Sequence, residues 1–437
     1  SAAETEQEEM TTLSSRSGEA EVSTAADLTS ALRDSTKDTV KLTADIIIDT
    51  TLTVNRAVTL DLNGFVLQRT GEGSVIKVEQ GGELTIADSN KNTAHKFAQN
   101  TAGLSAGLWE LVSDDSTTSK TVSGGIITGG KAQKGGGVYV APGGKLNMTG
   151  GSIVGCQARY GGGVYLDNND QTGEPSEFTM TSSRIIGCTA SEQGGGVVVD
   201  PACTFTMDND SEIRSCTARL GGGVYTNNSD TNGKGVFTLR NGAILSCTAD
   251  TSGFLFSQGG GVYNLGAFIM KSGTIKGCTA IKERPTGGVL NRREFTMSGG
   301  MIGKEDKRHV YNDATEAAVL TISGAAKIYT NVANDSRLNA YGGEISGEVK
   351  NAVDSRYAVI TGTEEAAGST EFSGAVINSE AGTIAGGVFT GSVTNNLGAI
   401  LGGDFSQATL SGRLVITFDP NNEDDRRWIG VRTENHL

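Results

Sequence analysis

The sequence predicts an all-β solenoid built from stacked three-strand coils, and three observations indicate it. A glycine-rich string recurs along the chain, and each copy is followed by a Phe-Thr-Met-like triplet and a Cys-Thr-Ala-like triplet. Apolar and polar residues alternate at fixed places within these repeats. The 437 residues include 62 Gly but only 5 Pro, without a collagen period, as expected where many tight turns need a positive φ.

The glycine-rich string sets the length of one repeat. Successive copies lie roughly 25 to 38 residues apart, and the three short strand signals in each repeat describe one coil of a solenoid. The string weakens toward Gly287-Gly288-Val289-Leu290 and His309-Val310-Tyr311. The full copies occupy Gly135 to Tyr139, Gly161 to Tyr165, Gly194 to Val198, Gly221 to Tyr225 and Gly259 to Tyr263.

The middle triplet predicts a strand with one buried face. Its outer positions are apolar in every repeat, and the position between them is most often Thr. This period-two alternation, with the same side chain recurring in each repeat, indicates parallel strands stacked in register. The first apolar column is Leu146, Phe178, Phe205, Phe237, Phe268, Phe295 and Leu320. The second is Met148, Met180, Met207, Leu239, Met270, Met297 and Ile322. The next strand contributes Ile153, Ile185, Ile213, Ile244, Ile275, Ile302 and Ile328.

Five of the six cysteines occupy one repeat position, and Cys203 stands apart. Stacked coils would place neighbours in such a column about 4.8 Å apart, but parallel side-chain directions suit a disulfide poorly. We therefore expect a buried ladder of free thiols. We expect no metal site, because no Cys-x-x-Cys pair or neighbouring His is present. The five are Cys156, Cys188, Cys216, Cys247 and Cys278.

Charge and hydropathy restrict the partners. The formal net charge of −14 argues against nucleic acid and against an anionic membrane surface. No run of about 20 apolar residues is present, so we expect no membrane insertion. We expect no cofactor.

The predicted organisation is one long domain between two short ends. Residues 1–22 are acidic and polar and are expected to form a disordered leader. Residues 23–415 are expected to be a single solenoid domain, whose core has no size limit, and residues 416–437 a C-terminal cap or linker. A short helix over Ala25–Leu32, with a capping box from Thr24 to Asp27, should cover the N-terminal end. Early strands are expected at Thr39–Leu42, Ile46–Ile48, Val58–Leu62, Val75–Val78 and Leu84–Ile86.

Two parts of the chain carry a family resemblance. The stretch Val58-Thr59-Leu60-Asp61-Leu62-Asn63-Gly64, within residues 25–86, resembles the N-terminal cap and first coils of pectate-lyase-like right-handed parallel β-helices. The glycine-rich strings and Phe-Thr-Met units resemble the repeats of bacterial cell-surface β-helix adhesins, including wall-attached Gram-positive ones. The resemblance implies a right-handed parallel β-helix, secreted and extracellular. No wall-anchoring motif is present, so attachment to the cell would need sequence outside this chain. This scaffold carries both enzymes and non-catalytic adhesins.

A catalytic interpretation rests on one break in the repeat. The signatures of pectin hydrolases are absent, and the three histidines, His95, His309 and His436, offer little for a His-based triad. Where the glycine-rich string is expected, Asp306 and Asp313 flank the residues from Lys307 to Asn312. These two acids could supply the carboxylate pair of a glycoside hydrolase, similar to the β-helical lacto-N-biosidase family of gut bacteria. A fully extended strand would instead separate them by about 20 Å.

A binding interpretation rests on a tyrosine row. If the valines of the glycine-rich strings face inward, the following residues face outward, and exposed tyrosines beside a glycine floor would suit sugar rings. The alternative is a packed ladder covered by turns. The row consists of Tyr139, Tyr165, Tyr225, Tyr263 and Tyr311.

Variable loops supply further candidates. The loop from Asp250 to Gln258 carries Phe254 and Phe256, and His309 lies in the repeat break, so these three are added as ligand-binding candidates. The inserts Asn168–Gly173 and Asn228–Gly233 imitate the start of a calcium loop but lack its distal Glu, so hydrogen-bonded turns are expected. The sequence therefore favours a non-catalytic surface adhesin or glycan-binding module, with a glycan or another host or bacterial surface ligand as partner. A glycoside hydrolase is the alternative.

Overall fold

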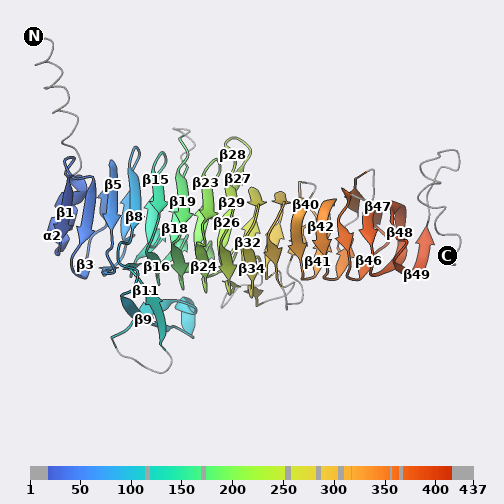
Figure 1. Ribbon diagram of the computed structural model, residues 1–437, viewed down its shortest axis with the longest axis horizontal. Helices are drawn as coiled ribbons and strands as arrows, with labels where there is room; N and C mark the ends of the chain where they lie inside the picture. The colour runs from blue at the N-terminus through green and yellow to red at the C-terminus, as the bar shows by residue number, and fades with distance from the viewer. Residues whose placement is uncertain are drawn as a thin grey trace, which may run out of the picture.

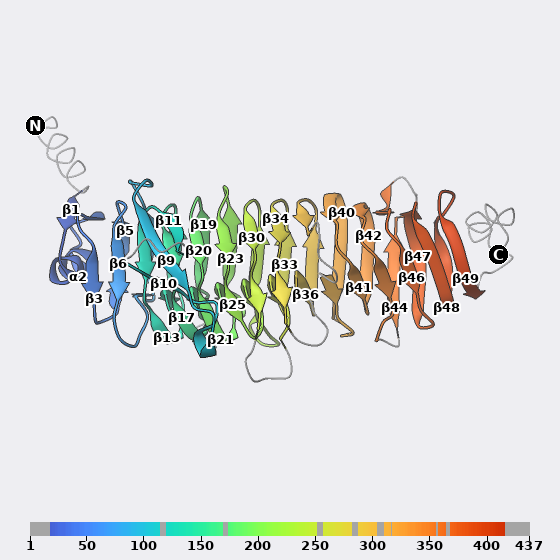
Figure 2. The same ribbon diagram turned by 90° about the horizontal axis from the view of Figure 1, so that it is seen from below.

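The computed structural model describes residues 18–113, 119–168, 174–250, 257–281, 287–303, 310–315, 317–354, 357–363 and 368–415. These residues form an elongated rod of stacked strands that the chain builds in order from one end to the other (Figure 1). The view turned by 90° shows the same rod (Figure 2). Thirty-eight strands belong to one sheet, whose pairings are parallel and join each repeat to the next. The predicted all-β fold of stacked parallel strands is confirmed.

A short helix covers the N-terminal end of the rod, as predicted. Helix α2 (Ala25–Arg33) begins after Thr24, whose Oγ1 accepts a hydrogen bond from the backbone N–H of Asp27 at 3.1 Å. Leu28 and Leu32 of α2 are buried against the first coil. The helix therefore closes the apolar core at this end.

Residues 19–22, which the sequence analysis placed in the disordered leader, form a strand. Strand β1 (Glu19–Val22) pairs in parallel with β2 (Thr39–Leu42), and the Val22 side chain joins the core. One buried side chain and a backbone ladder are enough to order this segment, although it lacks apolar periodicity.

Each coil contributes one strand to each of three columns. The first column, which follows the glycine-rich string, contains β4 (Leu52–Val54), β7 (Ile76–Val78), β14 (Val138–Val140), β18 (Val164–Leu166), β22 (Val197–Val199), β26 (Val224–Thr226), β32 (Val262–Asn264), β36 (Val289–Asn291), β39 (Val310–Asn312), β41 (Val332–Asn334), β43 (Val349–Asn351) and β46 (Val376–Asn378). The second contains β2, β5 (Ala57–Asp61), β8 (Glu83–Ala87), β15 (Lys145–Met148), β19 (Glu177–Thr181), β23 (Thr204–Asp208), β29 (Val236–Leu239), β33 (Ala267–Met270) and β37 (Glu294–Met297). The third contains β3 (Ile46–Ile48), β6 (Val66–Arg69), β12 (Ile126–Thr128), β16 (Ser152–Val154), β20 (Arg184–Ile186), β24 (Glu212–Arg214), β30 (Ala243–Leu245), β34 (Thr274–Lys276) and β38 (Met301–Ile302).

The later coils are shorter because the second and third columns merge. Strand β40 continues through both columns and pairs with β42, with a register shift between Gly324 and Lys327 where earlier coils have a turn. The strands of this part of the rod are β40 (Val319–Ile328), β42 (Arg337–Ile345), β44 (Ala358–Gly362), β45 (Glu371–Phe372), β47 (Gly382–Phe389), β48 (Ser392–Asp404) and β49 (Thr409–Val415). Strand β47 repeats this arrangement, β44 and β45 fill the two columns as separate strands, and β48 and β49 run from the first column into the second.

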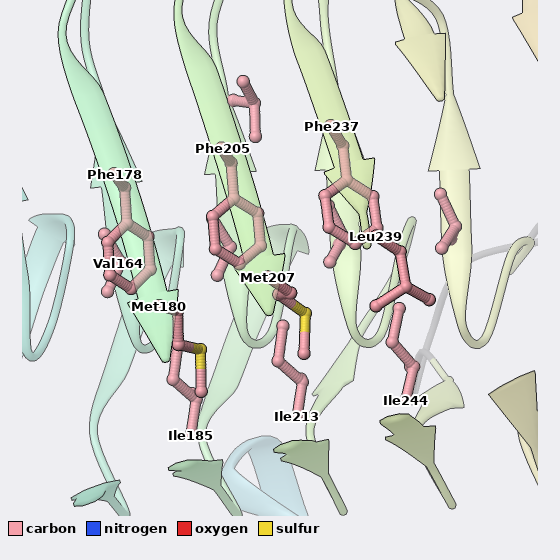
Figure 3. Close-up of a cluster of buried hydrophobic side chains, with 14 of the residues drawn as sticks. Val164, Phe178, Met180, Ile185, Phe205, Met207, Ile213, Phe237, Leu239 and Ile244 are labelled. Carbon is pink, nitrogen blue, oxygen red and sulfur yellow. The ribbon is translucent and has the colours of Figure 1, made fainter. Parts of the chain in front are cut away.

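The predicted core columns are confirmed. Phe178, Phe205 and Phe237 stack with ring centroids 4.7 and 5.0 Å apart, and the Met and Ile columns lie beside them (Figure 3). All six cysteines are buried and free, and the thiol of Cys216 donates to the carbonyl of Arg214 at 3.4 Å. The five-membered thiol ladder is therefore confirmed. No helix among the described residues is long and apolar enough to cross a membrane.

A second sheet runs along one corner of the rod. In six coils, from β12 to β34, it follows the third column just before the glycine-rich string, and all its pairings are parallel. Its strands are β13 (Lys131–Lys134), β17 (Gln157–Tyr160), β21 (Thr189–Gln193), β25 (Thr217–Ala218), β31 (Thr248–Ala249) and β35 (Thr279–Ala280).

An inserted sheet interrupts the coil between β8 and β12. Its antiparallel strands are β9 (Ala94–Gln99), β10 (Trp109–Leu111) and β11 (Lys120–Ser123), with a 3-10 turn, η1, at Gly103–Ser105. It projects from the side of the rod in Figure 1. Trp109 is buried with Val66, Ile126, Val154 and Ile186 on the outer face of the third column. The repeat analysis did not predict this insertion, because its contacts occur once and follow no period.

Candidate functional site

The tyrosine row is mostly covered, so the prediction of an exposed row is wrong for four of its five members. Tyr165, Tyr225, Tyr263 and Tyr311 are between 4% and 7% exposed, and Tyr139 is half-buried. The rings do point away from the main core, as alternation predicts. They form a separate apolar cluster, against which Tyr160, Leu220 and Leu265 pack. The alternative of a packed ladder describes them better, although side chains such as Leu220 and Leu265 pack against it where the alternative expected turns.

Carboxylates satisfy the hydroxyl groups of three of the tyrosines. The Tyr139 hydroxyl donates to Asp167 Oδ2 at 2.6 Å, and the Tyr165 hydroxyl donates to Asp200 Oδ2 at 2.6 Å. The Tyr311 hydroxyl donates to Asp335 Oδ2 at 2.9 Å. In each case the acid belongs to the coil that follows the tyrosine. The acids therefore link neighbouring coils beside the tyrosine row.

The Asp200 carboxyl is perturbed by this environment. Burial raises its pKa from 3.8 to about 6, and the hydrogen bonds from Tyr165 and from Asn227 Nδ2 oppose the shift only in part. Burial, together with the charge of Asp200, also raises the pKa of Tyr165. The site thus holds a carboxyl whose pKa is raised above the ordinary range of an aspartate.

The raised pKa of Asp200 predicts a pH-dependent stability. Between pH about 4 and pH about 6 the folded protein keeps a proton that the unfolded chain has released, so the stabilising contribution of this proton is lost as the pH rises. We expect the loss to be on the order of 2 kcal/mol. Urea unfolding of the wild type and of Asp200→Asn at pH 4 and pH 7.5 measures it. The free energy of unfolding of the wild type should fall relative to that of the variant. An equal difference at both pH values would contradict the prediction.

An open hollow lies where the tyrosine row begins. Its volume is about 440 Å³, and the half-buried Tyr139 lines it together with Glu72, Ser74, Lys131 and Lys134. We call it the Tyr139 hollow. It lies between the turn after β6 and strand β13, which are joined by backbone hydrogen bonds between Gly73 and Lys131.

The polar groups of the Tyr139 hollow contact one another and the backbone. Lys131 Nζ lies 2.8 Å from Glu72 Oε1, and the Ser74 hydroxyl donates to the carbonyl of Lys134 at 3.2 Å. Lys134 Nζ lies 3.2 Å from Asp167 Oδ2 and 4.5 Å from the centroid of the Tyr165 ring. The hollow therefore presents an aromatic ring beside charged and hydroxyl groups, of which Lys131 and Glu72 are exposed to solvent.

The predicted carboxylate pair is only partly described. Asp306 and His309 lie outside the described residues. Asp313 is 8% exposed, and its Oδ2 lies 2.5 Å from Arg292 Nε. Its Oδ1 accepts a hydrogen bond from the backbone N–H of Ala314 at 2.8 Å. Asp313 is thus held in an ion pair beside the tyrosine row.

The remaining loop candidates have different outcomes. Phe254 and Phe256 lie outside the described residues, as does most of the insert Asn168–Gly173. The insert Asn228–Gly233 is part of a small antiparallel hairpin of β27 (Asn228–Ser229) and β28 (Gly233–Lys234). Within the described part of the chain, no cluster of three or more His, Cys, Asp or Glu side chains is arranged to hold a metal ion.

Comparisons with known proteins add no argument about this chain. Among solved structures, the chain aligns with one titled "L. reuteri 53608 SRRP", a serine-rich repeat protein, at 12% sequence identity and a TM-score of 0.23. The alignment covers 91% of this chain and 98% of that one. A likeness at this TM-score carries no argument for fold or function. No protein family and no curated protein matches the sequence.

Proposed function

We propose that the protein is a non-catalytic bacterial surface adhesin or glycan-binding module, extracellular and attached to the cell through sequence outside this chain. In this proposal the rod is a right-handed parallel β-helix, which is the hand that parallel crossovers strongly prefer. Its partner is a glycan or another host or bacterial surface ligand. The Tyr139 hollow is the proposed binding position.

The observation that carries the proposal is the half-buried ring of Tyr139 in an open hollow. Sugar rings pack their apolar faces on aromatic side chains and form hydrogen bonds through their hydroxyl groups. Glu72, Ser74 and Lys131 supply donors and acceptors at the same place. A volume of about 440 Å³ is within the usual range for small-ligand sites. The other tyrosines of the row lack this combination, because neighbouring side chains cover them.

Truncation of Tyr139 tests the proposal. Tyr139→Ala is expected to weaken glycan binding by roughly 1 to 3 kcal/mol, the loss typical of a central aromatic contact. Binding to an immobilised panel of neutral and acidic oligosaccharides, followed by calorimetry on the best ligand, measures it. The matched control is Tyr263→Ala, which should lower the free energy of unfolding by about 3 kcal/mol without a selective effect on affinity. Retention of no glycan by the wild type, or normal binding by Tyr139→Ala, would overturn the proposal.

A glycoside hydrolase that uses Asp306 and Asp313 is the second candidate, and its only support is the break in the repeat. The ion pair between Asp313 and Arg292 counts against it, because a nucleophile or general acid must be able to reach the sugar. Turnover of an oligosaccharide by the wild type would restore this candidate.

A further inference from the structure

The Tyr139 hollow lies at a step in the rod, where the second sheet begins. Strand β13 is the first strand of that sheet, and the coil before it contributes a turn in which Gly73 is joined to Lys131 by backbone hydrogen bonds. The tyrosine row begins in the same coil, because the ladder neighbours of Tyr139 are Tyr165 on one side and Lys77 on the other. The hollow therefore adjoins the end of an aromatic stack.

The Tyr139 side chain offers apolar ring surface rather than a free hydroxyl group. Its ring centroid lies 6.2 Å from that of Tyr165, at an interplanar angle of 29°. Its hydroxyl group already donates to Asp167 Oδ2 at 2.6 Å. The ring therefore lines the hollow as a surface for the C–H groups of a ligand, and a pyranose ring presents such groups on its apolar face.

Each charged side chain that lines the hollow has a partner of opposite charge within the protein. Lys131 Nζ lies 2.8 Å from Glu72 Oε1, and Lys134 Nζ lies 3.2 Å from Asp167 Oδ2. The first pair is exposed to solvent, whereas the Asp167 side chain is 14% exposed and also accepts the hydrogen bond from Tyr139. Two cations are thus balanced by two carboxylates, which leaves no unpaired charge for a charged ligand.

Two further features favour an uncharged ligand. The exposed side-chain amide of Gln133 lines the hollow and offers both a donor and an acceptor, which suits the hydroxyl groups of a sugar. The formal net charge of −14 also disfavours the approach of an anion to the chain.

We propose that the Tyr139 hollow selects a neutral hexopyranose and discriminates against uronic acids, an inference that rests on the proposed function and names the class of its ligand. The apolar face of the sugar packs on the Tyr139 ring, and a hydroxyl group of the sugar forms a hydrogen bond with the Gln133 amide. A carboxylate on the sugar would meet Glu72 or Asp167, or would separate one of them from its lysine. Either event lowers the affinity.

Calorimetric titration of the full chain with matched methyl β-glycosides tests the proposal. The probes are the D-glucoside, the D-galactoside and the corresponding uronides, and each pair differs only in the carboxylate at C6. At least one neutral glycoside is expected to bind about ten-fold more tightly than its uronide. Tyr139→Ala should weaken this binding about ten-fold, and Gln133→Ala about three-fold.

Glu72→Gln isolates the contribution of charge. The variant leaves Lys131 without its carboxylate partner, so the ratio of neutral to uronide affinity should fall from about ten-fold to about two-fold. Glu79→Gln is the control, because Glu79 pairs with Lys77 and does not line the hollow. It should leave the ratio unchanged.

Failure of this preference and failure of the proposed function give different results. A uronide that binds as tightly as its neutral counterpart, with an affinity that Tyr139→Ala lowers, would overturn only the preference for neutral sugars. An unchanged ratio in Glu72→Gln would overturn the same preference. Binding of none of the four glycosides, or normal binding by Tyr139→Ala, would overturn both.

Discussion

Replacing Phe237 with Ala is expected to lower the free energy of unfolding by about 3 to 5 kcal/mol. Phe237 is fully buried, and its ring stacks between Phe205 and Phe268 at centroid distances of 5.0 and 4.9 Å. Both neighbours are fixed by their own coils, so the structure can close the resulting cavity only in part. Urea unfolding followed by circular dichroism measures the change.

Thr238→Ala is the matched control for Phe237→Ala. Thr238 lies on the same strand but on its outward, half-buried side, so its truncation should change stability by under about 1 kcal/mol. A loss below about 0.5 kcal/mol for Phe237→Ala would be incompatible with the stacked core.

The second large effect is expected at Asn334, within a ladder of buried asparagines. From Asn264 onward, the third residue of each first-column strand is Asn, and each side chain donates to the next one along the rod. The Nδ2–Oδ1 distances are 2.7 to 2.8 Å. The ladder contains Asn264, Asn291, Asn312, Asn334, Asn351, Asn378 and Asn395.

Asn334→Ala is expected to destabilise the rod by about 2 to 5 kcal/mol. It leaves Asn351 Oδ1 and the carbonyl of Val359 without this donor, and Asn312 Nδ2 without this acceptor, all in the interior. Each buried polar group left unsatisfied costs roughly 1 to 3 kcal/mol. Thermal and urea unfolding measure the loss.

Asn339→Ala is the comparison for the ladder. Asn339 is half-buried and donates to Thr321 Oγ1 at 3.1 Å, so its truncation should cost under about 1 kcal/mol. If Asn334→Ala and Asn339→Ala lower the free energy of unfolding equally, the buried ladder contributes no more to stability than a half-buried hydrogen bond.

The repeat pattern predicted the parts of the fold that depend on local periodicity. The strands at Thr39–Leu42 and Ile46–Ile48 have the predicted bounds, and α2 extends one residue beyond the predicted helix. The two strands follow from the alternation of apolar and polar residues, and the start of the helix follows from the cap that Thr24 forms with Asp27. The Phe column could be predicted because the same residue type recurs at the same position of successive coils.

The asparagine ladder left a signal that the prediction did not use. The pattern Val-x-Asn recurs in the first-column strands from Val262 to Asn395. Its Asn takes the place that Val140 and Leu166 fill in earlier coils. A polar residue on the inward face looks like a defect in a hydrophobic pattern. Only stacking of identical side chains makes it favourable.

The candidate sites were predicted less well, because exposure depends on neighbours distant in sequence. Alternation placed Tyr225 correctly outside the main core, but Leu220 from the preceding corner and the adjoining tyrosines cover it. The inserted sheet packs on the third column through Trp109, and this contact occurs once. A contact that is made in only one coil leaves no recurring pattern in the sequence, so a comparison of repeats does not reveal it.

The direction of the hydrogen bonds between coils has a mechanical consequence. The ladders join each coil to the next, so their bonds run along the rod, and each coil contacts only its neighbours. A pull on the two ends would therefore load the outermost ladder first and peel the rod coil by coil. At one end α2 packs on the first coils and must be detached first. Under tension we therefore expect the first coils to peel only after α2 has been detached from them.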